Sequence, residues 1–99
     1  MITKENILSF LSNNKNYFKE RYHIARIGIF GSYSRNEYSN DSDIDVIIEF
    51  DENIEHVFDA KYELKEFLQN HFNKSIDLCR EKSLNKLFYK KIIEEAIYV

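Results

Sequence analysis

The sequence predicts an α/β (α+β) domain whose elements alternate αβαβαβα around a three-stranded mixed sheet, with the helices packed on one face. Three observations support this. Residues 24–30 and 43–50 are rich in β-branched residues, two later stretches carry apolar residues at helical spacing, and there is neither proline nor an internal repeat. A chain of 99 residues suits one hydrophobic core, so we expect residues 1–99 to form a single domain.

The first element is a helix that Thr3 caps, because apolar residues follow Thr3 at helical spacing. Three asparagines between residues 13 and 16 weaken the middle of this helix. The stretch 24–30, IARIGIF, is β-branched and stops at Gly31, which predicts the first strand. Residues 32–41 are polar, with room for one or two turns of helix.

The second strand begins at residue 43, where the sequence DIDVIIEF alternates between two faces. Apolar spacing predicts a helix over residues 54–71, a short third strand over 75–79, and a last helix that Ser83 caps and that runs to Ile97. A crossover helix between the second and third strands favours a parallel, right-handed unit. The link between the first two strands is short enough to leave both parallel and antiparallel pairing open.

The charge of the chain is segregated. Residues 1–35 carry six Lys/Arg against two acids, residues 36–66 two against eleven, and residues 67–99 six against four. The net charge of −3 lacks the basic surplus of a DNA-binding domain, so we expect no sequence-specific nucleic acid as partner. No apolar run approaches the ~20 residues that are needed to span a bilayer, and no secretory signal is recognisable. The sequence therefore predicts a cytoplasmic protein that does not bind a membrane. The single cysteine, Cys79, excludes an internal disulfide.

Three aspartates are predicted to share one face of the sheet. Asp43 and Asp45 lie two residues apart at the start of the second strand, and Asp77 lies near the start of the third. If these strands are parallel neighbours, the three side chains point away from the apolar face. Carboxylates that close on one point repel each other unless a cation is present, and Mg²⁺ prefers such oxygen ligands. Two acids on a solvated strand face are the simpler explanation of Asp43 and Asp45 alone, but Asp77 arrives independently at the same place.

A glycine–serine turn is predicted beside these carboxylates. Gly31 lets backbone N–H groups approach an anion without interference from a Cβ, and Ser32 adds a hydroxyl donor. Arg35 has two interpretations. It reaches a bound phosphate, or it pairs at the surface with Glu37 or Asp41.

The combined pattern resembles the DNA polymerase β-like nucleotidyltransferase superfamily, and in particular its minimal nucleotidyltransferase (MNT) group. The residues that carry the resemblance are Gly31-Ser32-x-x-Arg35-x(5)-Asp41-Ser42-Asp43-Ile44-Asp45, then Ser75-Ile76-Asp77-Leu78, and the closing Ile93-Glu94-Glu95-Ala96-Ile97-Tyr98. The resemblance implies nucleotide binding by Gly31, Ser32, Arg35 and Ser42. It also implies that Asp43 and Asp45 ligate two Mg²⁺ ions and that Asp77 completes the metal site and activates the attacking hydroxyl.

This group is similar to the antitoxin half of HEPN/MNT toxin–antitoxin pairs, in which the MNT protein transfers AMP from ATP to a tyrosine of the HEPN toxin. The resemblance therefore implies a Mg²⁺-dependent nucleotidyltransferase with ATP as donor and a HEPN-domain toxin as partner. A non-catalytic antitoxin that silences its partner by binding, and transfer to a small molecule, remain as alternatives, and a homo-oligomer and a hetero-oligomer are both open. Many relatives have glycine after the arginine; Asn36 tolerates a left-handed turn and predicts altered local geometry rather than a lost site.

Overall fold

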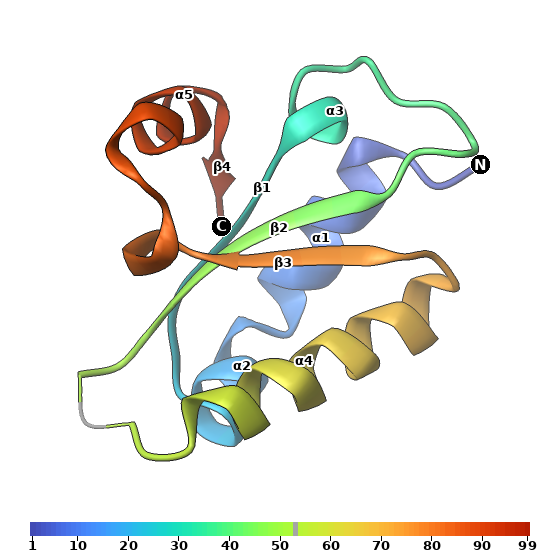
Figure 1. The fold of residues 1–99 in the computed structure, drawn as a ribbon. Coiled ribbons are helices and arrows are strands. Elements are labelled where there is room, and N and C mark those ends of the chain that lie inside the picture. Colours follow the sequence, from blue (N-terminus) through green and yellow to red (C-terminus); the bar gives the residue numbers. More distant parts are fainter. Residues whose placement is uncertain (53) are drawn as a thin grey trace.

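The computed structural model describes residues 1–52 and 54–99, and its sheet has four strands where the sequence predicted three (Figure 1). The strands are β1 (Ile24–Phe30), β2 (Ile44–Phe50), β3 (Ile76–Arg80) and β4 (Ile97–Tyr98), in the order β3-β2-β1-β4. Strand β2 is parallel to β3, which confirms that prediction. Strands β1 and β2 are antiparallel, which decides the pairing that the sequence left open.

The fourth strand begins at Ile97, the residue at which the last helix was predicted to end. Helix α5 (Lys86–Glu95) ends before Ala96, whose backbone is extended (φ −66, ψ 139). The chain then pairs antiparallel with β1 beside Gly28, where a Cβ would lie 2.4 Å from the Ile97 carbonyl oxygen. The three-stranded prediction was wrong because a two-residue strand is too short to show an alternating pattern, and because Ile97 also fits the helical spacing of α5.

The helices of the N-terminal half begin and end close to their predicted positions. Thr3 caps α1 (Lys4–Asn13) through a complete capping box, as predicted. The expected weak point is a break at Asn14, after which α2 (Lys15–Tyr22) continues the chain. The polar stretch after β1 forms one short helix, α3 (Gly31–Ser34).

The later helices differ from their predicted bounds by one to three residues. Helix α4 covers Val57–Phe72. The cap of α5 is Asn85, whose side chain accepts a hydrogen bond from the Phe88 N–H, and not Ser83, which ends the short 3₁₀ turn η1 (Glu81–Ser83). No helix in the described ranges is long and apolar enough to cross a bilayer.

The main core lies between one face of the sheet and helices α1, α2 and α4 (Figure 1). Its buried sheet residues are Ile27, Ile29, Ile44, Val46, Ile48, Ile76 and Leu78. Helix α5 departs from the predicted one-sided packing. It contacts β1 and α3, contributes no buried residue, and its last side chain reaches Gly31. Residues that alternate with the core, among them Asp45 and Asp77, point to the opposite face of the sheet.

A buried ion pair fixes the far end of β2. Glu49 is 4% exposed and accepts hydrogen bonds from Arg80, from the Phe50 N–H and from the Lys82 N–H. Burial alone would raise the pKa of Glu49, but these three donors outweigh it and hold the pKa below its ordinary value. This carboxylate therefore ties β2 to β3 and to the turn that follows β3.

The substitution Glu49→Gln is expected to lower the free energy of unfolding at pH 7 by about 2 kcal/mol, because hydrogen bonds to a charged group contribute ~1.5–3 kcal/mol. A carboxyl with a lowered pKa stabilises the fold above its unfolded pKa and loses that contribution as the pH falls through the folded pKa. Urea unfolding of both proteins at pH 7 and at pH 3 checks this: the difference between them should shrink at pH 3. An equal difference at both values would contradict it.

Candidate active site

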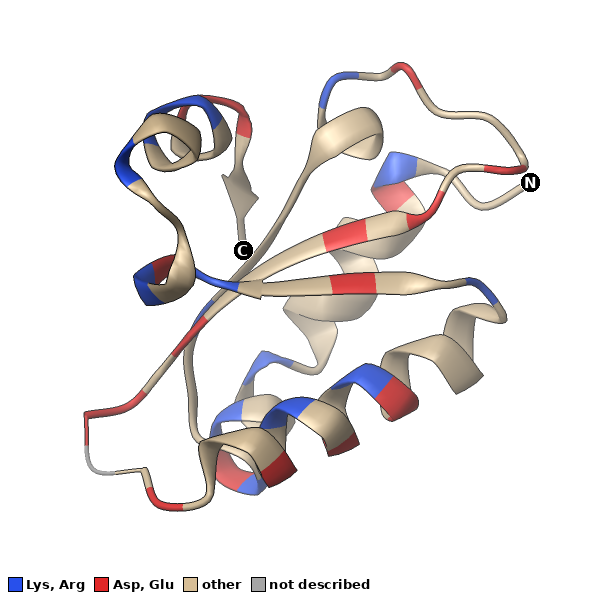
Figure 2. Ribbon diagram, viewed as in Figure 1, with Lys and Arg blue, Asp and Glu red and all other residues tan. Residues whose placement is uncertain are grey.

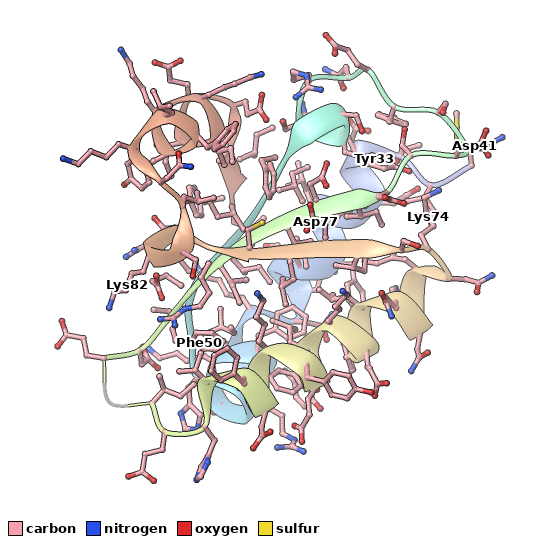
Figure 3. All side chains as sticks on the ribbon, in the orientation of Figure 1. Tyr33, Asp41, Phe50, Lys74, Asp77 and Lys82 are labelled. Atoms are coloured by element: carbon pink, nitrogen blue, oxygen red, sulfur yellow. The ribbon has the colours of Figure 1, made fainter. Side chains whose placement is uncertain are left out.

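Asp45 and Asp77 lie side by side on neighbouring strands. In the parallel pairing of β2 with β3, Asp45 is the direct partner of Asp77, and on its other side Asp45 pairs with Phe30 of β1. Figure 2 shows the two acidic positions next to each other on β2 and β3, and Figure 3 shows Asp77 at the centre of this face. Asp43 comes just before β2, two residues from Asp45, so strand alternation directs it to the same face.

The Asp45 carboxyl has a strongly perturbed pKa. Partial burial raises it most, and the nearby carboxylates of Asp77 and Asp43 raise it further, so that the pKa of Asp45 moves from 3.8 to about 6. Arg35 acts in the opposite direction, and Glu95 adds a smaller upward contribution. The chain therefore holds negative charges together at this point, and the positive charge of Arg35 offsets them in part.

The crowding of these carboxylates lowers the stability of the folded protein at neutral pH. Between pH 3.8 and about 6 the folded protein binds more protons at Asp45 than the unfolded chain does. The contribution of Asp45 to stability therefore falls as the pH rises through this window, and it is unfavourable at pH 7. Each pKa unit corresponds to about 1.4 kcal/mol, and solvent screening at a partly exposed group reduces this to about 1–2 kcal/mol in total.

In metal-free buffer at pH 7, Asp45→Asn is expected to raise the free energy of unfolding by about 1 kcal/mol, which corresponds to roughly 4–8 °C in Tm for a domain of this size. At pH 3.5 most of the gain should be gone, because Asp45 is then protonated in the folded state and largely protonated in the unfolded state. Thermal unfolding followed by circular dichroism provides the measurement. A variant less stable than the wild type at pH 7 would show that the Asp45 carboxylate stabilises the fold instead.

Gly31 is required by the position of Asp45. It has a positive φ of 71°, and a Cβ built on it would lie 2.0 Å from the Asp45 Oδ2 atom. Its N–H, which the sequence assigned to phosphate binding, donates to the Glu95 carboxylate at 2.9 Å. The structure thus gives this glycine a role the sequence did not predict: it makes room for the central carboxylate.

The other residues predicted to bind the nucleotide differ in the hydrogen bonds and ion pairs that their side chains already make. Ser32 is half-buried in α3, and its hydroxyl makes no hydrogen bond within the part of the chain that the structure describes. The hydroxyl of Ser42 accepts a hydrogen bond from the Ser39 N–H and so shapes the loop before Asp43. Arg35 pairs with Glu37, as one of its two interpretations expected, and also with Glu95.

Asn36 and Tyr33 shape and support the turn after β1. Asn36 has φ of 60°, the left-handed conformation predicted for it. Tyr33 is 1% exposed and stacks on Tyr38 with 4.2 Å between ring centroids, so its ring packs inside the protein beneath α3 (Figure 3). Its ring is thus part of the packing that supports the turn.

Glu95 is the residue of this site that the sequence analysis missed. It was quoted in the closing motif but received no role, because its contact with Gly31 spans 64 positions of the chain. One signal was present: Glu94 and Glu95 stand at the C-terminal end of a helix, where the helix dipole disfavours carboxylates.

The donor set suits Mg²⁺. Asp43, Asp45 and Asp77 offer hard carboxylate oxygens, and the carboxylates of Asp77 and Asp43 add to the effect of burial in raising the pKa of Asp45. Within residues 1–52 and 54–99, no three acidic, imidazole or thiol groups converge closely enough to form a ready-made metal site.

The chain is similar to known proteins. Residues 11–99 match the family model described as nucleotidyltransferase domain. The protein adenylyltransferase MntA of Thermococcus cleftensis is 36% identical over 99 residues, which covers 100% of this chain and 98% of that relative.

Two solved structures share the fold. One, described as a minimal nucleotidyltransferase, gives a TM-score of 0.80 at 24% identity, covering 97% of this chain and 95% of that one. Another contains tri-AMPylated Shewanella oneidensis HEPN toxin in complex with MNT antitoxin, with a TM-score of 0.61 at 18% identity, covering 92% of this chain and 70% of that one. At these sequence identities, the similarity to the two solved structures shows that the mixed α+β fold is shared and nothing more.

Proposed function

Because the chain belongs to the nucleotidyltransferase domain family and is a nucleotidyltransferase, we propose that it transfers AMP from ATP to a tyrosine hydroxyl of a HEPN-type toxin and thereby acts as an antitoxin. The family membership expected from the glycine–serine and aspartate motifs is confirmed by the match over residues 11–99. The observation that carries the proposal is the pairing of Asp45 with Asp77 beside the Gly31 turn.

The three aspartates have different proposed roles, metal binding and proton acceptance. Asp43 and Asp45 would hold Mg²⁺, with Asp77 completing the set. Bound Mg²⁺ would neutralise charge on the triphosphate and on the departing pyrophosphate. Asp77 is exposed on the strand next to Asp45, where it accepts the proton of the attacking hydroxyl. The hydroxyl oxygen bonds to the α-phosphorus as the bond to pyrophosphate breaks.

The turn after β1 serves the phosphates of ATP. The Ser32 hydroxyl has no partner among the described residues and is available as a donor. Arg35 brings a guanidinium to the same place, where Glu95 orients it. Ser42 acts through the loop conformation, since its hydroxyl is bonded to the Ser39 N–H.

A protein acceptor suits both the relatives and the surface. The relative MntA is named a protein adenylyltransferase, and one neighbour of the same fold holds an AMPylated HEPN toxin. Helix α5, next to the site, exposes Leu87, Phe88 and Tyr89, at 86%, 58% and 44%. An exposed apolar surface of this kind, on the helix whose last residue contacts Gly31, fits docking by another protein.

The same surface favours a second candidate function, silencing of the partner by binding alone. Exposed apolar residues on α5 would support a stable complex whether or not transfer occurs. Transfer to a small molecule is the weaker alternative, since nothing in the described structure favours it over a protein acceptor.

Labelled ATP separates transfer from binding. The chain is incubated with a purified HEPN-type toxin, Mg²⁺ and ATP labelled at the α-phosphate, and the proteins are separated under denaturing conditions. Label is expected on the toxin, and peptide mapping should place it on a tyrosine. ATP labelled at the γ-phosphate is the matched control and should leave the toxin unlabelled.

The outcomes are distinct. Loss of toxin activity without any label supports binding alone, and label from γ-labelled ATP would indicate phosphorylation. Either result contradicts the proposal. Omission of Mg²⁺ and addition of a chelator should abolish labelling with wild-type protein.

A further inference from the structure

Glu95 binds two groups of the candidate site with one carboxylate. Its Oε1 accepts a hydrogen bond from the Gly31 N–H at 2.9 Å, and its Oε2 accepts one from Arg35 Nη1 at 3.0 Å. The Glu95 side chain is 16% exposed, whereas that of Glu37, the other carboxylate bound to Arg35, is 65% exposed. Glu95 is therefore the sheltered partner of the turn and of the arginine.

The backbone around Glu95 is anchored independently of that turn. On the helix side, the Ala96 N–H donates to the Ile92 carbonyl. On the strand side, β4 pairs with β1, and the Val99 N–H donates to the Ile27 carbonyl. The sheet thus anchors the backbone that carries Glu95, and the Glu95 carboxylate in turn holds the Gly31 turn through its hydrogen bond.

The turn in question borders Asp45. Gly31 lies so close to the Asp45 carboxylate that a Cβ on it would overlap the Oδ2 atom. A shift of this backbone would open or close the space in which Asp45 sits. The bond from Gly31 to Glu95 therefore fixes one wall of the Asp45 site, and the second bond holds the Arg35 guanidinium, whose charge acts on Asp45.

Glu95 occupies an electrostatically costly position. A carboxylate in the last turn of a helix opposes the helix dipole, and this one also adds negative charge near the Asp45 carboxylate. A residue that breaks a local rule in this way is typical of functional sites.

We propose that Glu95 is a positioning residue for nucleotidyl transfer: it holds Gly31 and Arg35 in the arrangement that the aspartates require and contacts neither ATP nor the acceptor. This inference deepens the proposed function and rests on it. It predicts a larger effect on the rate of the chemical step than on ATP affinity.

Glycine labelling tests the contact without any activity. The chain has two glycines, so protein labelled with ¹⁵N-glycine gives two amide signals, from Gly28 and Gly31. In Glu95→Ala the Gly31 signal should shift and its amide hydrogen should exchange at least about tenfold faster, while Gly28 in β1 stays unchanged. Glu94→Ala is the matched control, because Glu94 is exposed and its side chain makes no ion pair within residues 1–52 and 54–99.

Steady-state transfer to the toxin supplies the second readout. Glu95→Ala should lower kcat by about tenfold or more, because small displacements of reacting groups carry rate costs of this order, with KM for ATP changed less than about threefold. Glu95→Gln has one oxygen for two donors, so its kcat should fall between those of the wild type and Glu95→Ala. Glu94→Ala should match the wild type.

Three results would overturn the inference. These are an unchanged Gly31 signal in Glu95→Ala, an equal change at Gly28 that reveals loss of β4, or wild-type kcat in Glu95→Ala and Glu95→Gln. An inactive wild-type protein would overturn the proposed function, whereas an active wild type beside an unimpaired Glu95→Ala variant overturns this inference alone.

Discussion

Asp43→Asn and Asp45→Asn are each expected to lower AMP transfer by about a thousandfold or more, because each removes a charged ligand from the proposed Mg²⁺ site, where charge stabilisation supplies most of the acceleration. Neither substitution changes the size of the side chain. Transfer of label from α-labelled ATP to the toxin, measured over a range of enzyme concentration, provides the rate.

Stability separates this effect from misfolding. Asp45→Asn should be inactive and yet more stable than the wild type in metal-free buffer, since it removes the carboxyl whose pKa is raised to about 6. An inactive and destabilised variant would leave folding as the cause. Transfer within a few-fold of the wild-type rate in both variants would remove Asp43 and Asp45 from the active site.

Gly31→Ala is expected to lower transfer by about a hundredfold or more while costing only about 1–2 kcal/mol of stability. A new Cβ would meet only side-chain atoms of Asp45 among its three nearest neighbours, Oδ2 at 2.0 Å, Cγ at 2.9 Å and Cβ at 3.2 Å, and not backbone. The Asp45 carboxylate can therefore yield, so the protein folds with its central ligand displaced. The positive φ of 71° accounts for the remaining cost in stability.

A double-mutant cycle checks this explanation. In an Asp45→Ala background the clash is absent, so Gly31→Ala should cost only the backbone strain, about 1 kcal/mol, and the two substitutions should be non-additive. Additive losses of stability would show that Gly31 and Asp45 do not compete for the same space.

The arrangement of the aspartates could be predicted because it depends on strand periodicity and on one topological rule. Strand alternation placed Asp43 and Asp45 on one face, and the parallel crossover brought Asp77 beside Asp45, as the register of β2 with β3 confirms. These inferences need only local pattern and the handedness of the connection.

The rest of the site depends on contacts between distant parts of the chain, which a local sequence pattern does not predict. Glu95 meets Gly31 across 64 positions only because β4 returns the chain to β1, and β4 has only two residues. Ile97, the first residue of β4, was assigned to the last helix, so the prediction missed the edge strand of the sheet and the role of Glu95. Residue type alone likewise could not distinguish Ser32, whose hydroxyl makes no hydrogen bond to the residues that the structure describes, from Ser42, whose hydroxyl accepts one from the Ser39 N–H.

Intact-mass spectrometry of a HEPN-type toxin tests the central claim most directly. After incubation with the chain, Mg²⁺ and each nucleoside triphosphate in turn, the toxin should gain whole AMP units from ATP, and gain none when the chain carries Asp43→Asn together with Asp45→Asn. A toxin that is silenced at unchanged mass, or that gains AMP with the doubly substituted chain, would contradict the account.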